Sequence, residues 1–392
     1  MTAVTIAFLV LGPVGAFAAA PGTAAGSSAE TGAQIKPPQV SSPSAVLIDW
    51  ASGRVLFAKE ARRLRPMAST TKIMTALLVL ERGNLNDVVT VSRRAAATPG
   101  SSMHLRAGER LTLERVLYGI LMRSGNDASV AAAEHIAGSE AAFVAMMNAK
   151  ARALGAYDTQ FQNPHGLTAP GHYSTAYDLA LMARAALENP TFAEIVATRE
   201  KLFVSEDEKR QATLYNTNRL LWSFEGADGV KTGTTSVAGK CLVASATRGD
   251  QRLIAVVLHS GDRWGDAARL LSYGFKNFTL IRLATPGQVL RTVGVVRGEA
   301  PRTVVTAAGD YSVALRSDEA ALARVEWGFP DTLRAPVRRG DVVGEVRVYV
   351  GDELREAFPL VAQDDNRRRT PLRLFLRAFL PLLRLSARFG VE

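Results

Sequence analysis

The alternation of apolar and polar residues predicts strands in two places far apart in the chain. Residues 45–60 hold two apolar runs around Ser52-Gly53, the pattern of a β-hairpin. Strand character returns near 240–247 and 252–259, with residues 248–251 as the turn between them. Strands from both ends of a segment, with helices between them, indicate an α/β domain with a mainly antiparallel sheet.

Between these strands the apolar residues recur at helical spacing. The first predicted helix begins close behind Ser69 and ends at Gly83. The second follows Thr112, a residue of the type that caps helices. Further helices are predicted over residues 128–137 and 140–154, after Ser174, and near 264–275.

From about Thr285 the pattern changes to short Val-rich runs separated by Gly, Pro and Asp turns. No amphipathic helix is expected before residue 363. We therefore predict a small all-β domain over residues 282–362, without a catalytic cluster of its own. The boundary is expected between Phe278 and Thr285, so the first domain would comprise residues 43–281.

The N-terminus has a pattern typical of export. A short apolar run is followed by Ala-Phe-Ala at residues 16–18, a cleavage pattern, so residues 1–18 are predicted to be a signal peptide. Residues 19–42, rich in Pro, Gly, Ser and Ala, are predicted to be a flexible linker. No Lys or Arg precedes Lys36, which leaves open whether Met1 is the true start.

Residues 363–392 are predicted to end the chain in an amphipathic helix. Three arginines, Arg367 to Arg369, lead into Thr370-Pro371, a cap followed by proline at the first helical position. Four later arginines fall on one side of the helix and Leu and Phe cover the rest, which argues against a transmembrane span. We expect residues 367–392 to lie on a membrane surface, with packing on a protein surface as the alternative.

Composition adds few constraints. Apolar residues make up 47% and charged residues 21%, a balance that allows a sizeable core. The net charge is +10, but the basic residues are mostly scattered and no nucleic-acid motif is present, so we expect no nucleic-acid partner. Cys241 is the single cysteine, which excludes an internal disulfide. The five histidines lack metal-ligand spacing, so neither a metal nor a cofactor is expected.

Three short motifs occur in a telling order, beginning with Ser69-Thr70-Thr71-Lys72. Residues three apart at the start of a helix share a face, so Ser69 and Lys72 are within reach of each other. A serine hydroxyl needs a base, and a neutral Lys72 can serve if burial and a nearby cation lower its pKa. Lys231 is a candidate for that cation. The N–H of Ser69 would help hold an oxyanion. Without the other motifs, a helix cap and an exposed lysine would explain these residues.

The second motif is Ser124-Gly125-Asn126, in a loop between predicted helices. Ser124 would relay a proton to the leaving amine, and the Asn126 amide would hold the substrate backbone. An ordinary turn with cap residues is the alternative.

The third motif is Lys231-Thr232-Gly233, expected on a strand at the edge of a cleft. Lys231 and Thr232 would bind a terminal carboxylate, Gly233 would leave room for substrate, and the N–H of Thr234 would be the second oxyanion donor. An exposed turn is the alternative.

Together the S-x-x-K, S-x-N and K-T-G motifs are the signature shared by penicillin-binding proteins and class A β-lactamases. With the blocks at residues 163–167, 174–178 and 228–233, the sequence resembles the low-molecular-weight D-alanyl-D-alanine carboxypeptidases, strongly over residues 43–281. The resemblance implies a β-lactamase/DD-peptidase-like catalytic domain, a second β domain and a membrane anchor. It also implies an acyl-enzyme on Ser69, peptidoglycan stem peptides and β-lactams as partners, and a role in cell-wall biogenesis and cell shape outside the cytoplasmic membrane.

Two residues depart from or extend this pattern. Lys240 stands where the family leads us to expect an aromatic residue, and Arg263 is a further candidate carboxylate partner, with an ordinary surface arginine as the simpler expectation. A β-lactamase would need a separate base for deacylation, and no convincing Glu-x-x-x-Asn loop follows the second motif. An endopeptidase and a non-catalytic penicillin sensor stay open as alternatives.

Overall fold

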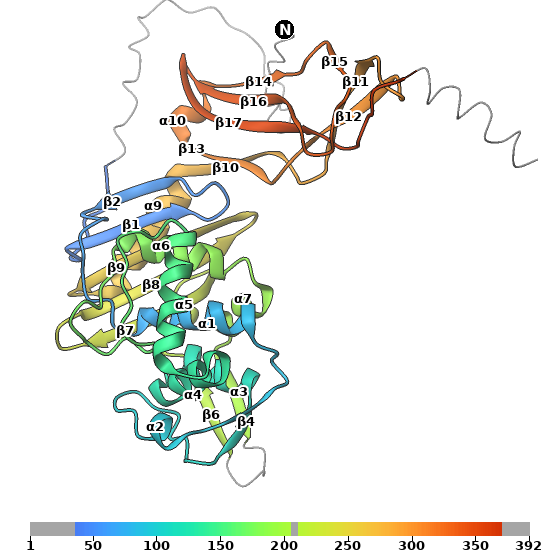
Figure 1. Cartoon of the computed structure of the whole chain (residues 1–392). Helices are drawn as coiled ribbons and strands as arrows, with labels where there is room; N and C mark the ends of the chain where they lie inside the picture. Colours follow the sequence, from blue (N-terminus) through green and yellow to red (C-terminus); the bar gives the residue numbers. More distant parts are fainter. Residues whose placement is uncertain (1–35, 205–210, 371–392) are drawn as a thin grey trace, which may run out of the picture. The chain divides into compact units, whose positions relative to one another are not determined.

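The computed structural model describes residues 36–204 and 211–370. The predicted signal peptide, most of the linker and the tail helix from Pro371 onward lie outside the described residues. The described chain divides into two units, one ending at Phe278 and the other beginning at Thr279 (Figure 1). Each is described by itself.

The first unit is built on a five-stranded sheet with the order β2-β1-β9-β8-β7, in which every neighbouring pair is antiparallel. Strand β1 is paired on both sides, so Ser44 to Asp49 lie opposite Leu258 to Leu253 on β9. The predicted α/β fold with a mainly antiparallel sheet is thereby confirmed. The strands of this unit are β1 (Ser44–Asp49), β2 (Val55–Lys59), β3 (Val88–Thr90), β4 (Arg110–Thr112), β5 (Glu200–Val204), β6 (Gln211–Tyr215), β7 (Ala227–Thr235), β8 (Gly239–Arg248) and β9 (Gln251–Ser260).

Helices cover both faces of this sheet. Leu47 of β1 and Leu253 of β9 face α9, where a Cβ on Gly274 would lie within 3 Å of both side chains. Val46 and Ile48, which alternate with Leu47, point instead into the core built around α1. The helices are α1 (Lys72–Arg82), α2 (Arg93–Ala96), α3 (Leu113–Met122), α4 (Asn126–Ala137), α5 (Glu140–Ala153), α6 (Ala176–Ala186), α7 (Pro190–Ala197), α8 (Leu220–Ser223) and α9 (Arg263–Asn277), with a 3-10 turn η1 (Ala68–Thr71) before α1.

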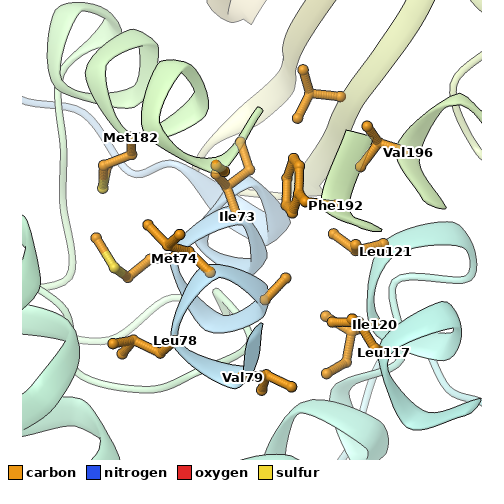
Figure 2. Packing of buried hydrophobic residues seen from close by; sticks show 14 of the residues in the cluster. Ile73, Met74, Leu78, Val79, Leu117, Ile120, Leu121, Met182, Phe192 and Val196 are labelled. Atoms are coloured by element: carbon orange, nitrogen blue, oxygen red, sulfur yellow. The ribbon is translucent and has the colours of Figure 1, made fainter. Parts of the chain in front are cut away.

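Helix α1 is the centre of the helical core. Every residue from Lys72 to Val79 is buried, so the helix has no solvent face over its first two turns. Figure 2 shows its apolar side chains between those of α3, α6 and α7. Burying each such side chain contributes roughly 1.5–3 kcal/mol. This packing fixes the start of α1, and with it Ser69 and Lys72, in the interior of the unit.

The N-terminal segment of the unit is tied to its last helix. The buried carboxylate of Asp266 accepts hydrogen bonds from the backbone N–H of Ser41 (2.9 Å) and Ser42 (2.8 Å) and from the Ser41 hydroxyl (2.7 Å). Burial alone would raise the pKa of Asp266, but hydrogen bonds from Ser260 and Ser41 outweigh it and bring the pKa to about 2. The carboxylate therefore stays ionised and keeps the segment before β1 in place.

The second unit is predominantly β, as the Val-rich pattern predicts. A six-stranded sheet has the order β14-β16-β17-β12-β11-β15, and β10 pairs with β13. Its core includes Val305, Val346 and Leu360. Pairing continues beyond residue 362, because Asn366 donates its backbone N–H to Val337 (2.7 Å) and Arg369 to Arg297 (2.8 Å). Its elements are β10 (Phe278–Ala284), β11 (Val289–Val296), β12 (Arg302–Ala307), β13 (Tyr311–Arg316), α10 (Ser317–Ala320), β14 (Ala323–Gly328), β15 (Thr332–Arg334), β16 (Val342–Val350) and β17 (Glu353–Ala362).

Candidate active site

Ser69 lies on the turn η1, directly before α1. The residue before it, Ala68, has a φ of +49°, a left-handed conformation that costs roughly 1–2 kcal/mol for a residue with a Cβ. Hydroxyl groups hold the turn in this shape: Thr70 donates to the carbonyl of Met67 (2.7 Å) and Thr71 to that of Ala68 (2.8 Å). The turn is thus braced from within, and the Ser69 side chain stays only partly buried.

Lys72 is fully buried and its ammonium nitrogen is surrounded by three acceptors. Nζ lies 3.1 Å from Ser69 Oγ, 2.7 Å from Asn126 Oδ1 and 2.6 Å from the carbonyl oxygen of His165. The predicted proximity of Ser69 and Lys72 is therefore present. Because Nζ is held from three sides, it has a fixed direction relative to the serine hydroxyl.

The environment of Lys72 disfavours its charge. Burial, and after it the ammonium of Lys231, hold the pKa of Lys72 well below its usual range, while the carboxylate of Asp127 opposes them. Both causes are those that a lysine base requires, a dry site and a second cation. A neutral amine with a free lone pair can accept the proton of a serine hydroxyl.

The second motif lies where α3 gives way to α4. Ser124 is buried and has a φ of +64°, and Asn126 is the first residue of α4. The Asn126 amide is already engaged, since Oδ1 accepts from Lys72 and Nδ2 donates to the carbonyl of Pro99 (2.6 Å). Over residues 36–204 and 211–370, no hydrogen bond joins the Ser124 hydroxyl to Lys72. The motif thus brings Asn126 into direct contact with Lys72, whereas the structure shows no such contact for Ser124 within the described residues.

The third motif lies on β7, an edge strand of the five-stranded sheet. Lys231 is buried and its Nζ donates to the carbonyl of Thr232 (3.1 Å). The hydroxyl of Thr232 lies 2.7 Å from that of Thr217. The motif therefore lies on a strand, as the sequence predicts.

Gly233 is the point at which this strand meets the nucleophile turn. A Cβ at Gly233 would lie 2.9 Å from the backbone nitrogen of Ser69 and 3.0 Å from the carbonyl oxygen of Met67. Such contacts are closer than real side chains make, so the approach requires glycine. Thr234, the next residue, is exposed. The structure thus brings Ser69, Lys72, Asn126 and the third motif into one site.

Arg263 lies at the start of α9 and differs from the simple expectation of a surface arginine. It is half-buried, and its Nη1 donates to the carbonyl of Gly233 (3.1 Å) and to the hydroxyl of Thr234 (2.8 Å). Burial, and after it the Arg263 guanidinium, lower the pKa of Lys231 to about 7. Arg263 therefore braces β7 and adds positive charge behind Lys231. Lys240 is exposed on β8, opposite Thr234.

Residues 31–261 match the family described as D-alanyl-D-alanine carboxypeptidase, peptidase S11, which is more than half of the chain. The chain belongs to this family. Residues 278–368 match the C-terminal domain of penicillin-binding protein 5. The family resemblance and the fold expected from the motifs are both confirmed.

Named relatives from this family align with most of the chain. D-alanyl-D-alanine carboxypeptidase DacF of Bacillus subtilis is 37% identical over 83% of this chain and 86% of its own length. D-alanyl-D-alanine carboxypeptidase DacC of Escherichia coli is 35% identical over 84% of this chain and 86% of its own length. Among solved structures, penicillin-binding protein 5 from Haemophilus influenzae aligns with a TM-score of 0.75 and 30% identity, covering 85% of this chain and all of that one.

His165 and His172, which the sequence marks with no metal-ligand spacing, both lie beside the S11 site. His165 supplies the carbonyl that accepts from Lys72, and the His172 ring lies 2.9 Å from the Thr71 hydroxyl. Burial, and after it Lys72, lower the pKa of His165 to about 3 and of His172 to about 4, so both rings are neutral near pH 7. Neither ring therefore adds charge near Lys72.

Gly166 and Thr217 also contribute to the site, and no motif in the sequence marks Thr217. Gly166 has a φ of +92°, and a Cβ there would lie 2.0 Å from the carbonyl oxygen of Ala68. The family block at residues 163–167 is the one signal that points to Gly166.

Nowhere within residues 36–204 and 211–370 do three or more His, Cys, Asp or Glu side chains gather to hold a metal ion. No helix in those ranges is long and apolar enough to cross a bilayer.

Proposed function

We propose that this protein is a serine-type D-Ala-D-Ala carboxypeptidase that removes the terminal D-alanine from peptidoglycan stem pentapeptides. The observation that carries the proposal is the 3.1 Å contact between Ser69 Oγ and the Nζ of a fully buried Lys72. A nucleophile next to an amine of lowered pKa is the arrangement that acyl transfer requires.

In the acylation step, Ser69 Oγ attacks the carbonyl carbon of the penultimate D-alanine while neutral Lys72 takes the hydroxyl proton. The backbone N–H groups of Ser69 and Thr234 stabilise the negative oxygen that forms. The carbon–nitrogen bond then breaks, and the departing amine receives the proton through Ser124. Asn126 holds Lys72 in line and offers its remaining amide hydrogen to the substrate backbone.

The terminal carboxylate of the substrate would be bound by Lys231 and Thr232, with Arg263 behind them. A water molecule then hydrolyses the ester on Ser69, with Lys72 taking its proton, and the tetrapeptide leaves. A β-lactam presents a carboxylate and a reactive carbonyl to the same groups, so it would acylate Ser69 and block the site.

We place the enzyme on the outer face of the bacterial cytoplasmic membrane. Support for this comes from the signal-peptide pattern of residues 1–18 and the basic, apolar tail of residues 367–392. Tethering at the membrane would hold the site close to newly made wall peptides.

The experiment is mass spectrometry of the products after incubation with a stem pentapeptide and with a cross-linked dimer. Release of D-alanine from the pentapeptide, at a rate that penicillin abolishes, is the expected result. Cleavage of the cross-link alone would make the protein an endopeptidase. A stable adduct with penicillin but no peptide turnover would make it a sensor.

A further inference from the structure

A cavity of ≈ 520 Å³ lies next to the third motif. Two residues of its wall contact the motif directly. The Thr217 hydroxyl is hydrogen-bonded to that of Thr232, and Arg263 donates to the carbonyl of Gly233. Its walls include Thr217, Arg219, Lys240, Asp262, Arg263 and Trp264.

The charge of this cavity is unbalanced. Arg219, Lys240 and Arg263 are cationic, and Asp262 is the carboxylate among the wall residues named. The Asp262 carboxylate is already used, since it accepts the N–H of Gly265 (3.0 Å) and lies 3.6 Å from the guanidinium of Arg269. The wall therefore presents a surplus of positive charge next to the place where a substrate carboxylate is expected.

Arg219 and Lys240 are the two cations of the wall that have no carboxylate partner among the described residues. Both side chains are exposed, and within residues 36–204 and 211–370 neither forms an ion pair. Arg263, in contrast, is held by Gly233 and Thr234. Arg219 is the N-cap residue of α8 and Lys240 lies on β8, so two different elements bring these cations to the cavity wall.

We propose that this cavity is a subsite for the side chain of the leaving residue, and that Arg219 and Lys240 make it favour leaving residues that carry a carboxylate. The inference rests on the proposed carboxypeptidase function, in which Lys231 and Thr232 bind the main-chain carboxylate. The side chain of that same residue starts from the Cα that bears this carboxylate, which places it at the mouth of the cavity. A D-alanine methyl group leaves most of the space and both cations unused, whereas D-glutamate or D-aspartate would use them.

The test compares three acyl-peptides that end in D-Ala-D-Ala, D-Ala-D-Glu and D-Ala-D-Gln. The last two differ only in the charge of the leaving side chain. We expect the intact enzyme to hydrolyse the D-Glu peptide with a kcat/KM roughly fivefold or more above that of the D-Gln peptide at low salt, and the ratio to fall as salt screens the exposed charges.

Variants then assign the effect to residues. Lys240→Gln and Arg219→Gln should each lower the D-Glu to D-Gln ratio about two- to fivefold, the range of a partly exposed ion pair. Lys276→Gln is the matched control, because Lys276 is an exposed cation near the far end of α9, roughly 20 Å along the helix from Arg263. Labelling by a fluorescent penicillin checks that every variant is folded.

The outcomes separate the two levels of the proposal. Equal kcat/KM values for the D-Glu and D-Gln peptides, with normal turnover of the D-Ala peptide, would overturn the subsite and leave the proposed function standing. An unchanged ratio in the double variant Arg219→Gln/Lys240→Gln would also overturn it. If none of the three peptides is hydrolysed, the proposed function fails and the subsite fails with it.

Discussion

Gly233→Ala tests whether the close approach of β7 to the nucleophile turn supports catalysis. The added Cβ would lie 2.9 Å from the nitrogen of Ser69, 3.0 Å from the oxygen of Met67 and 3.1 Å from the Cβ of Ala68. All three atoms belong to the backbone or to a Cβ, so no flexible side chain can move aside. Ordinary contact needs about 3.5 Å, so the strand and the turn must separate by roughly 0.5 Å.

That separation is large for a catalytic site. Productive geometry tolerates about 0.5 Å, and a misplacement of about 1 Å costs roughly 100-fold, so we expect acylation to slow about tenfold. Overpacking should also cost about 1–3 kcal/mol, which lowers the Tm of a unit of this size by roughly 2–12 °C.

The assay is the rate of labelling by a fluorescent penicillin, together with thermal unfolding. Gly309→Ala is the control, because its Cβ would meet only Tyr311 at 3.6 Å, an ordinary contact. A Gly233→Ala protein that acylates and melts like the wild type would show that β7 does not press on the Ser69 turn.

Three further variants test the other assignments. Ser69→Ala should abolish peptide turnover and penicillin labelling with an unchanged melting curve, and a label on the variant would mean that another residue is the nucleophile. The kcat/KM for peptide hydrolysis should rise with pH as Lys72 loses its proton at its lowered pKa. It should fall again as Lys231, with a pKa of about 7 in the free enzyme, loses the charge that binds the substrate carboxylate. Lys231→Met removes the cation that disfavours protonated Lys72, so the rising limb of kcat/KM against pH should move to higher pH, and an unmoved limb would contradict the coupling. Removal of residues 367–392 should release the protein from anionic liposomes in a flotation assay, because each basic residue near such a surface contributes roughly 1 kcal/mol to binding. Activity on a soluble peptide should not fall. A truncated protein that still floats would exclude this anchor.

The elements of the first unit could be predicted because their signals are local. Thr112 caps α3 by accepting the N–H of Arg115, and Gly83 ends α1, as the sequence pattern predicts. The proximity of Ser69 and Lys72 also follows from helical spacing alone. These features depend on residues a few positions apart, which a sequence shows directly.

Features that depend on distant contacts could not be predicted. The carbonyl of His165 that accepts from Lys72 lies in a loop 93 residues further along the chain. A contact made by a backbone carbonyl leaves no signal in the type of side chain. Arg263 carries no motif, and its contact with Gly233 exists only because α9 begins beside β7. The short strand pairs β3–β4 and β5–β6 are likewise held by tertiary packing rather than by a pattern of their own.

The link from Ser41 and Ser42 to Asp266 has a consequence for how the chain folds. Its partners are more than 220 residues apart, and β1 completes its pairing only when β9 is present. A sheet in which the first strand pairs with the last one has a high contact order. Such folds form slowly because a long loop must close before the strands can pair. A nascent chain that has not reached β9 leaves β1 with one neighbour. For a protein that we propose to be exported, a sheet completed this late would help the chain stay able to pass a translocation channel until nearly the whole catalytic unit has been made.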